Sequence, residues 1–115
     1  MRPITITQTN AGSTRWVATT AHLTPFNLTI GCEVVSGSPT FTVEYTLQDV
    51  NYNPNSQFAY TVDSPTLDVY PDPLVQGATA NSIAVQSSPV WAARVTVTGA
   101  GVVRATFLQA GIAGP

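Results

Sequence analysis

Apolar and polar residues alternate along much of the chain. The clearest stretches are residues 25–35 and 40–50, in which apolar side chains occupy every second position from Phe26 to Val34 and from Phe41 to Leu47. A period of two is typical of a β-strand with one buried face, and no stretch shows the 3.6-residue period of an amphipathic helix. The pattern therefore predicts an all-β protein.

Shorter segments of the same kind occur elsewhere. Strands are predicted at Ile4 to Ile6, at Trp16 and Val17, and over residues 91–98 and 102–109, with weaker candidates at 57–62, 66–70 and 82–86. About eight or nine short strands separated by turn residues indicate a single-domain antiparallel β-sandwich, of jelly-roll or immunoglobulin-like type. We place this domain at residues 1–110, followed by a flexible C-terminal tail at 111–115.

Two turns predict how neighbouring strands pair. Ser36, Gly37, Ser38 and Pro39 have the composition of a hairpin loop, which sets Cys32 opposite Val43 and Gly31 opposite Glu44. Gly99, Ala100 and Gly101 predict a second hairpin, between residues 91–98 and 102–109. Trp16 and Trp91 fall in predicted strands, where burial in the core is expected.

The middle of the chain has a different composition. Residues 51–77 are rich in asparagine, serine and proline, so any strand there is expected at a sheet edge, and we interpret the segment as a loop-rich insert. Tyr52 and Tyr70 lie in it. Exposed aromatic rings of this kind serve as flat platforms in carbohydrate-binding β-sandwiches, which keeps glycan recognition open.

Charged residues are scarce, which limits the classes of partner that we expect. The 115 residues include six acids, four arginines and no lysine, and 17 threonines supply much of the polar surface. Four arginines cannot form a stripe that follows a phosphate backbone, so nucleic acid is not expected as a partner. No apolar run approaches the roughly 20 residues that span a bilayer, so no membrane partner is expected either.

The charges are also segregated along the sequence. All six acids lie between Glu33 and Asp72, and the arginines Arg2, Arg15, Arg94 and Arg104 lie outside that span. Two interpretations follow: charges scattered over a solvated surface, or a bipolar surface that docks between neighbours.

The residues for catalysis and for metal binding are missing from the sequence pattern. His22 is the single histidine and Cys32 the single cysteine, on an inward strand position, so neither a catalytic triad nor a zinc site is expected, and one cysteine forms no internal disulfide. The segment that begins at Asp49 resembles the first half of a calcium-binding loop, but Pro54 stands where such a loop requires glycine. A looser site among Asp49, Asp63, Asp68 and Asp72, and an outward Glu33–Glu44 carboxylate pair, remain weaker alternatives. We expect no enzyme, no cofactor and no metal.

Several segments together resemble a known group of proteins. They are the opening RPITITQT, TPFN at residues 24–27, FTVEYTLQDV at 41–50 and ARVTVTG at 93–99. In this order they are similar to small virion structural proteins of tailed bacteriophages, which include head decoration (cement) proteins. The resemblance implies a β-sandwich made in the host cytoplasm that binds the outer capsid surface, stabilises contacts between major capsid proteins and associates with itself as a dimer or trimer.

The resemblance leaves other virion roles open. A tail-associated module that binds host-surface glycan would use Tyr52 and Tyr70, and a head-completion or neck component is the second alternative. For the capsid role, the candidate partner contacts are Arg2, Arg15, Arg94 and Arg104.

Overall fold

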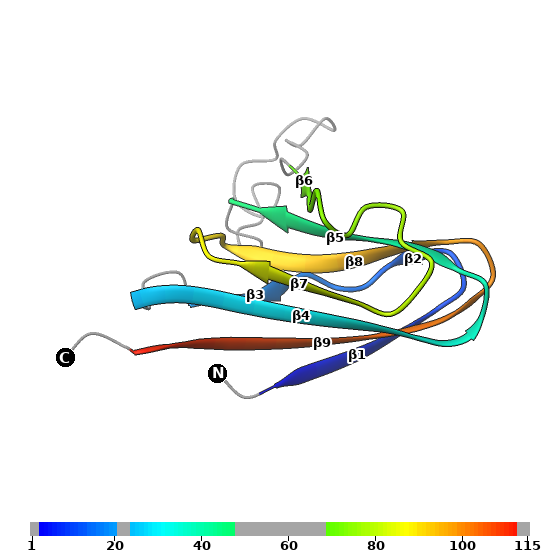
Figure 1. Ribbon diagram of the computed structural model, residues 1–115, viewed down its shortest axis with the longest axis horizontal. Coiled ribbons are helices and arrows are strands. Elements are labelled where there is room, and N and C mark those ends of the chain that lie inside the picture. The colour runs from blue at the N-terminus through cyan, green and yellow to red at the C-terminus, as the bar shows by residue number, and fades with distance from the viewer. Residues whose placement is uncertain (1–2, 21–23, 48–68, 113–115) are drawn as a thin grey trace, which may run out of the picture.

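Two antiparallel sheets lie face to face in the computed structural model, which describes residues 3–20, 24–47 and 69–112 (Figure 1). Sheet A has the order β1 (Ile4–Thr9), β9 (Gly101–Ile112), β4 (Thr24–Gly37) and β7 (Ser82–Gln86). Sheet B has the order β2 (Gly12–Ser13), β8 (Ala92–Thr98), β5 (Thr40–Thr46) and β6 (Tyr70–Pro71), and β3 (Val17–Ala18) also pairs with β8. The predicted β-sandwich of about nine strands is confirmed.

The core is formed by the inward half of each alternating strand. Leu28 and Ile30 of β4, Val43 of β5, Val95 of β8 and Phe107 of β9 are all 0% exposed. Their neighbours in sequence point outward, as the period of two predicts. Burial of these aliphatic and aromatic side chains from both sheets is the main force that holds the sandwich closed.

The two predicted hairpins are wrong, because each turn crosses from one sheet to the other. After β4 the chain passes from sheet A to sheet B, and after β8 it returns to sheet A (Figure 1). Cys32 therefore pairs with Ser82 and Ala105, and Val43 pairs with Val95. Two alternating strands bury their apolar faces equally well side by side or face to face across a core, so the pattern could not distinguish these arrangements.

Glycine makes the two crossings compatible, since they lie against each other at one end of the sandwich. Gly37 pairs with Gly101, and both have positive φ, 75° and 148°. A Cβ at Gly101 would lie 2.6 Å from Pro39 Cδ and 2.6 Å from Ser36 O, closer than side-chain atoms approach. A side chain at Gly101 would therefore force the two crossings apart.

Residues 71–78 cover the edge of sheet B beyond β5. Asp72 N–H donates to Val43 O (2.8 Å), and Val43 N–H donates to Val75 O (3.0 Å). The buried Asp72 carboxylate accepts hydrogen bonds from Tyr45 Oη (2.6 Å), Leu74 N (2.7 Å) and Val75 N (3.2 Å). The last part of the predicted insert thus has a fixed structure, whereas residues 51–68 lie outside the described residues.

The C-terminal strand is longer than the sequence indicated. β9 extends to Ile112, whose Cα partner is Thr24. Gly111 and Ile112, which we assigned to the tail, belong to this strand, and residues 113–115 lie outside the described part of the chain.

Candidate partner interface

A group of polar and aromatic side chains occupies the outer face of sheet B. Strand pairing places Arg94 of β8 opposite Glu44 of β5, and Thr96 opposite Ser13 of β2. Trp16, just before β3, lies over Arg94. We call these five residues, Ser13, Trp16, Glu44, Arg94 and Thr96, the Arg94 cluster.

Arg94 is held from two directions. Its Nε donates to Glu44 Oε1 at 2.8 Å, and its Cζ lies 4.4 Å from the centroid of the Trp16 ring. The side chains of Arg94 and Glu44 are only 26% and 18% exposed. A guanidinium that stacks on an indole face and also bonds a carboxylate has little rotational freedom, so this arginine is fixed in place.

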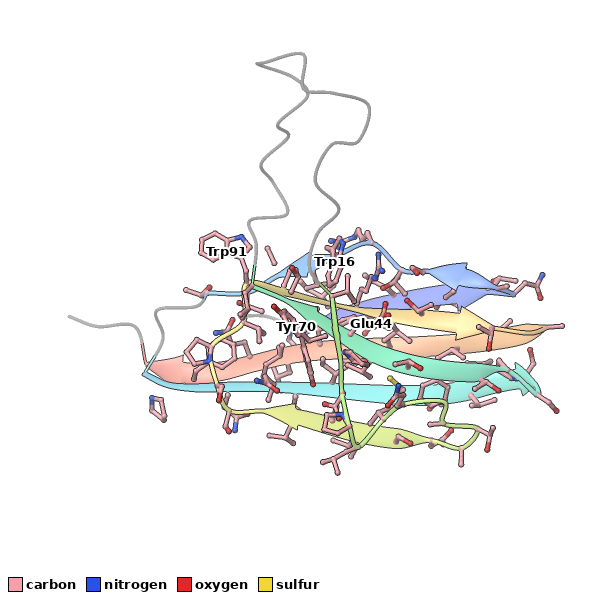
Figure 2. The ribbon with its side chains drawn as sticks, turned by 90° about the horizontal axis from the view of Figure 1, so that it is seen from above. Trp16, Glu44, Tyr70 and Trp91 are labelled. Carbon is pink, nitrogen blue, oxygen red and sulfur yellow. The ribbon has the colours of Figure 1, made fainter. Side chains whose placement is uncertain are left out.

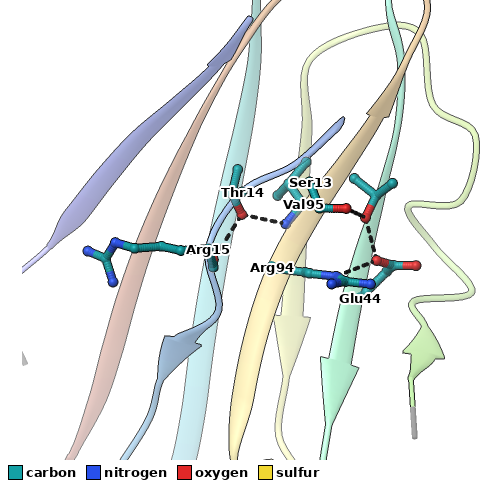
Figure 3. A network of polar contacts seen from close by, with 7 residues as sticks. Ser13, Thr14, Arg15, Glu44, Arg94 and Val95 are labelled. Atoms are coloured by element: carbon teal, nitrogen blue, oxygen red, sulfur yellow. Dashed lines mark hydrogen bonds and ion pairs between the residues drawn. The ribbon is translucent and has the colours of Figure 1, made fainter. Parts of the chain in front are cut away.

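Hydroxyl groups extend the cluster into a chain of hydrogen bonds (Figure 3). Thr96 Oγ1 donates to the same Glu44 Oε1, which leaves it to accept from Ser13 Oγ at 2.8 Å. Beside them, Thr14 Oγ1 accepts from Val95 N (3.1 Å) and donates to Arg15 O (3.1 Å). These bonds attach the segment between β2 and β3 to β8. They thereby fix the backbone from which the side chains of Arg15 and Trp16 project.

Arg15 has a different environment from Arg94. Its side chain is exposed and points away from the Arg94 cluster (Figure 3). Within the described residues it has no carboxylate partner. Arg15 is therefore a solvated positive charge at the rim of a face whose other charges are paired.

Sheet A carries a second ion pair on its own outer face. Arg104 of β9 lies opposite Glu33 of β4, with Nη1 and Oε1 3.2 Å apart and the two side chains 48% and 56% exposed. Acids and arginines that are separated in sequence thus neutralise each other across strands. For the described residues the bipolar interpretation is wrong. Arg2, Asp49, Asp63 and Asp68 lie outside them.

The aromatic candidates are distributed differently from the prediction. Trp91, the residue before β8, is 38% exposed and projects from the fold, so its expected place in the core is wrong (Figure 2). Trp16 is only half-buried, on the outer face rather than in the core. Tyr70 is 48% exposed and lines a hollow with Leu47, Pro71 and Pro89. Tyr52 lies outside the described residues.

Sequence reasoning missed the role of Trp16, and one signal could have revealed it. Trp16 is followed directly by Val17, which is buried in the core. Because successive side chains of a strand point to opposite faces, an inward Val17 favours the outer position for Trp16.

The candidate catalytic groups do not come together. Cys32 is buried, and burial raises the pKa of its thiol from 9.0 to about 12. Glu33 and Glu44 lie on the outer faces of different sheets, each beside its own arginine, so the carboxylate pair is wrong. No group of three or more histidine, cysteine or acidic side chains that could hold a metal ion occurs in the described residues, and His22 is not among these.

Burial affects a second titratable group in the core. Tyr45 has its pKa raised above the usual 10.0, first by desolvation and then by its hydrogen bond to Asp72. Both Asp72 oxygens accept hydrogen bonds from the protein, so this carboxylate supports the fold of residues 71–75. It is not arranged as an open cation ligand.

Comparisons with known proteins give a weak likeness of fold. No family model and no curated protein matches the chain. Among solved structures, a Bacillus endospore appendage, one of a family of disulfide-linked pili, aligns over 97% of this chain and 87% of its own, with 13% identity and a TM-score of 0.46. A likeness of this degree assigns neither a function nor a partner. In the described residues no helix is long and apolar enough to cross a membrane.

Proposed function

We propose that the protein is a non-enzymatic virion structural protein that binds the outer capsid surface of a tailed bacteriophage and stabilises contacts between major capsid proteins. The observation that supports this most directly is the Arg94 cluster, a fixed arginine–tryptophan pair on an otherwise neutral, hydroxyl-lined sheet face. The nature of the partner comes from the sequence resemblance.

The cluster has the properties of a protein-docking surface. Tryptophan and arginine are the residue types that most often dominate binding energy at protein interfaces. Arg94 is already held by Glu44 and Trp16, so docking would cost it little further side-chain entropy. Because Glu44 neutralises its charge, covering the pair removes less hydration than covering an isolated cation.

Arg15 would add direction to the docking. An exposed, unpaired cation beside a neutral platform gains from a carboxylate on the partner, and such rim charges mainly raise association rate and select the partner. We therefore assign the capsid contact to the outer face of sheet B, with Arg15 at its rim. The candidate Arg104 lies on the other sheet and is not part of this contact.

Cryo-electron microscopy of purified particles tests the proposal. Many copies spread over the shell would support decoration of the capsid. A small number at one vertex would instead indicate a neck or tail component, and absence from the particle would exclude every virion role. Comparison of shells with and without the protein under heat or low salt adds a functional readout: unchanged shell stability would contradict cementing.

Binding of the purified protein to stripped shells tests the contact face. We expect Trp16→Ala to weaken binding by about tenfold or more, as for an interface hot spot. Arg15→Gln and Arg104→Gln each remove one exposed positive charge, so they form a matched pair. Only Arg15→Gln is expected to slow association, and equal effects of the two would contradict the assignment to sheet B.

Glycan recognition is the second candidate, because of the hollow beside Tyr70. This hollow has a volume of about 350 Å³ and combines the rings of Tyr45 and Tyr70 with three prolines. Binding on a glycan array that is lost in Tyr70→Ala but kept in Trp16→Ala would favour this function over capsid docking.

A further inference from the structure

β7 forms an edge of sheet A, and the hydrogen-bond phase of the sheet shows which of its backbone groups are free. Asn10 N–H donates to Gly101 O at 2.7 Å, so the even-numbered residues of β1 face β9. In an antiparallel ladder bonded and non-bonded pairs alternate. The same alternation continues across β9 and β4, so that the even-numbered residues of β7 bond to β4. The N–H and C=O groups of Ile83 and Val85 therefore lie on the open side of β7.

An independent contact agrees with this phase. Val34 N–H donates to Asn81 Oδ1 at 2.8 Å, which places the even-numbered residues of β4 on the side of β7. In the described part of the chain no backbone group pairs with the open side of β7.

The exposed side chains of β7 are apolar. Ile83 is 69% exposed and Val85 51% exposed, and both lie on the outer face of sheet A. The strand Ser82–Gln86 contains no charge and no proline, the devices that normally protect a sheet edge. By contrast, the outward side chains of the opposite edge, β1, are threonines, and residues 71–78 pair with β5 at the edge of sheet B.

We infer that β7 pairs antiparallel with β7 of a second copy about a twofold axis at Ala84. Ile83 then lies opposite the second copy's Val85, and Val85 opposite its Ile83, each pair joined by two backbone hydrogen bonds. Ser82 lies opposite Gln86 on the other face, so apolar meets apolar and polar meets polar. The two four-stranded sheets become one continuous sheet.

The register follows from self-complementarity. A twofold axis at Ile83 would place Val85 opposite Asn81, and an axis at Val85 would place Ile83 opposite Ser87. Each of these pairs an aliphatic side chain with a polar one, whereas the axis at Ala84 buries all four aliphatic side chains. Because both copies contribute the same patch, the assembly closes at two.

The contact is small, which sets its strength. Two five-residue strands bury far less than the roughly 1,600 Å² of a standard interface, so we expect a dissociation constant in the micromolar to millimolar range. The dimer would be strengthened wherever copies are held close together. The inference does not depend on the proposed function, because it concerns the free protein in solution.

Cysteine pairing tests the register. Ile83→Cys and Val85→Cys proteins are mixed and oxidised, and disulfide dimers are measured on non-reducing gels, with wild type as the control for the buried Cys32. Opposed residues have Cα atoms about 5.5 Å apart, within disulfide range. We expect mixed dimers to form several-fold faster than dimers of either variant alone. Equal rates, or rates no faster than a Thr5→Cys and Thr7→Cys mixture on β1, would overturn the register.

Sedimentation up to about millimolar concentration tests the dimer itself. Val85→Pro and Thr7→Pro each remove an edge N–H that no ladder uses, so they are matched variants on β7 and β1. Val85→Pro, and Val85→Lys as a second variant, should abolish the dimer while thermal unfolding remains cooperative; Thr7→Pro should not affect it. A monomeric or trimeric wild type, or a dimer unaffected by both Val85 variants, would overturn the inference.

Discussion

The two sheets carry the same type of cross-strand ion pair in different surroundings. On sheet B, Arg94 and Glu44 are 2.8 Å apart, mostly buried, stacked on Trp16 and bonded to Thr96. On sheet A, Arg104 and Glu33 are 3.2 Å apart and about half exposed. Identical chemistry therefore yields a fixed surface on one sheet and a solvated pair on the other.

The edges of the two sheets differ in the same sense. The β5 edge of sheet B is covered by residues 71–78, which Asp72 holds in place. The β7 edge of sheet A, in contrast, pairs with nothing in the described part of the chain. Sheet B thus has a fixed outer face and a covered β5 edge, whereas sheet A has a β7 edge that is open within the described residues. Four predictions test this contrast.

The largest effect is expected where the edge of sheet B is covered. Asp72→Ala leaves the buried Tyr45 Oη and the part-buried Leu74 N–H without their acceptor, and it leaves Val75 N–H only its bond to the backbone carbonyl of residue 72. We expect a loss of about 3 kcal/mol in the free energy of unfolding. Tyr45→Phe removes only one donor and should cost about 1 kcal/mol. Denaturant titration measures both, and equal losses would contradict a central role for Asp72.

Alkaline pH should act on a buried group from each sheet. Cys32 of sheet A has its pKa raised from 9.0 to about 12, and the pKa of Tyr45 of sheet B is raised above 10.0. The unfolded chain loses these protons at a lower pH than the folded protein does. These two groups therefore leave the free energy of unfolding unchanged below pH 9 and lower it as the pH rises further. Each group contributes a slope of at most about 1.4 kcal/mol per pH unit.

Substitutions separate the two contributions. Cys32→Ala should remove the decline that begins near pH 9, and Tyr45→Phe the part that begins near pH 10. Urea unfolding between pH 8 and 11 measures the slopes. A Cys32→Ala slope equal to that of wild type would show that the thiol is not protected by burial.

The fixed ion pair of sheet B should be measurable in stability. Arg94→Ala removes the bond to Glu44 and the stack on Trp16 together, and we expect a loss of about 1–2 kcal/mol. A double-mutant cycle with Trp16→Ala isolates the stacking energy, expected at about 0.5–1 kcal/mol. A coupling energy of zero would mean that the ring covers Arg94 without binding it.

The sequence predicted the strands better than their partners. Alternation identified the inward residues of β4 and β5, because burial on one face requires a period of two. Alternation does not distinguish strands that pair in one sheet from strands that face each other across the core, so it predicts hairpins at Gly37 and Gly101 where the chain crosses between the sheets.

The candidate site was predicted only in part, for the same reason. Arg94 was a candidate contact, but its link to Glu44 depends on which strands become neighbours. Trp16 was assigned to the core because burial is the usual fate of a strand tryptophan. The order of the strands brings each of two acids opposite an arginine that is distant in sequence. No local sequence pattern contains this order, so the pairing of these charges could not be predicted.

The smallest effect is expected at the solvated pair of sheet A. Arg104→Ala should change the free energy of unfolding by less than about 0.5 kcal/mol, because a half-exposed pair gains little over its hydration. Salt should weaken that small contribution further, since solvent screens exposed charges. Chemical unfolding of Arg104→Ala and Arg94→Ala at low and high salt makes the comparison. If Arg104→Ala proved as costly as Arg94→Ala, burial and stacking would not be what distinguishes the two faces.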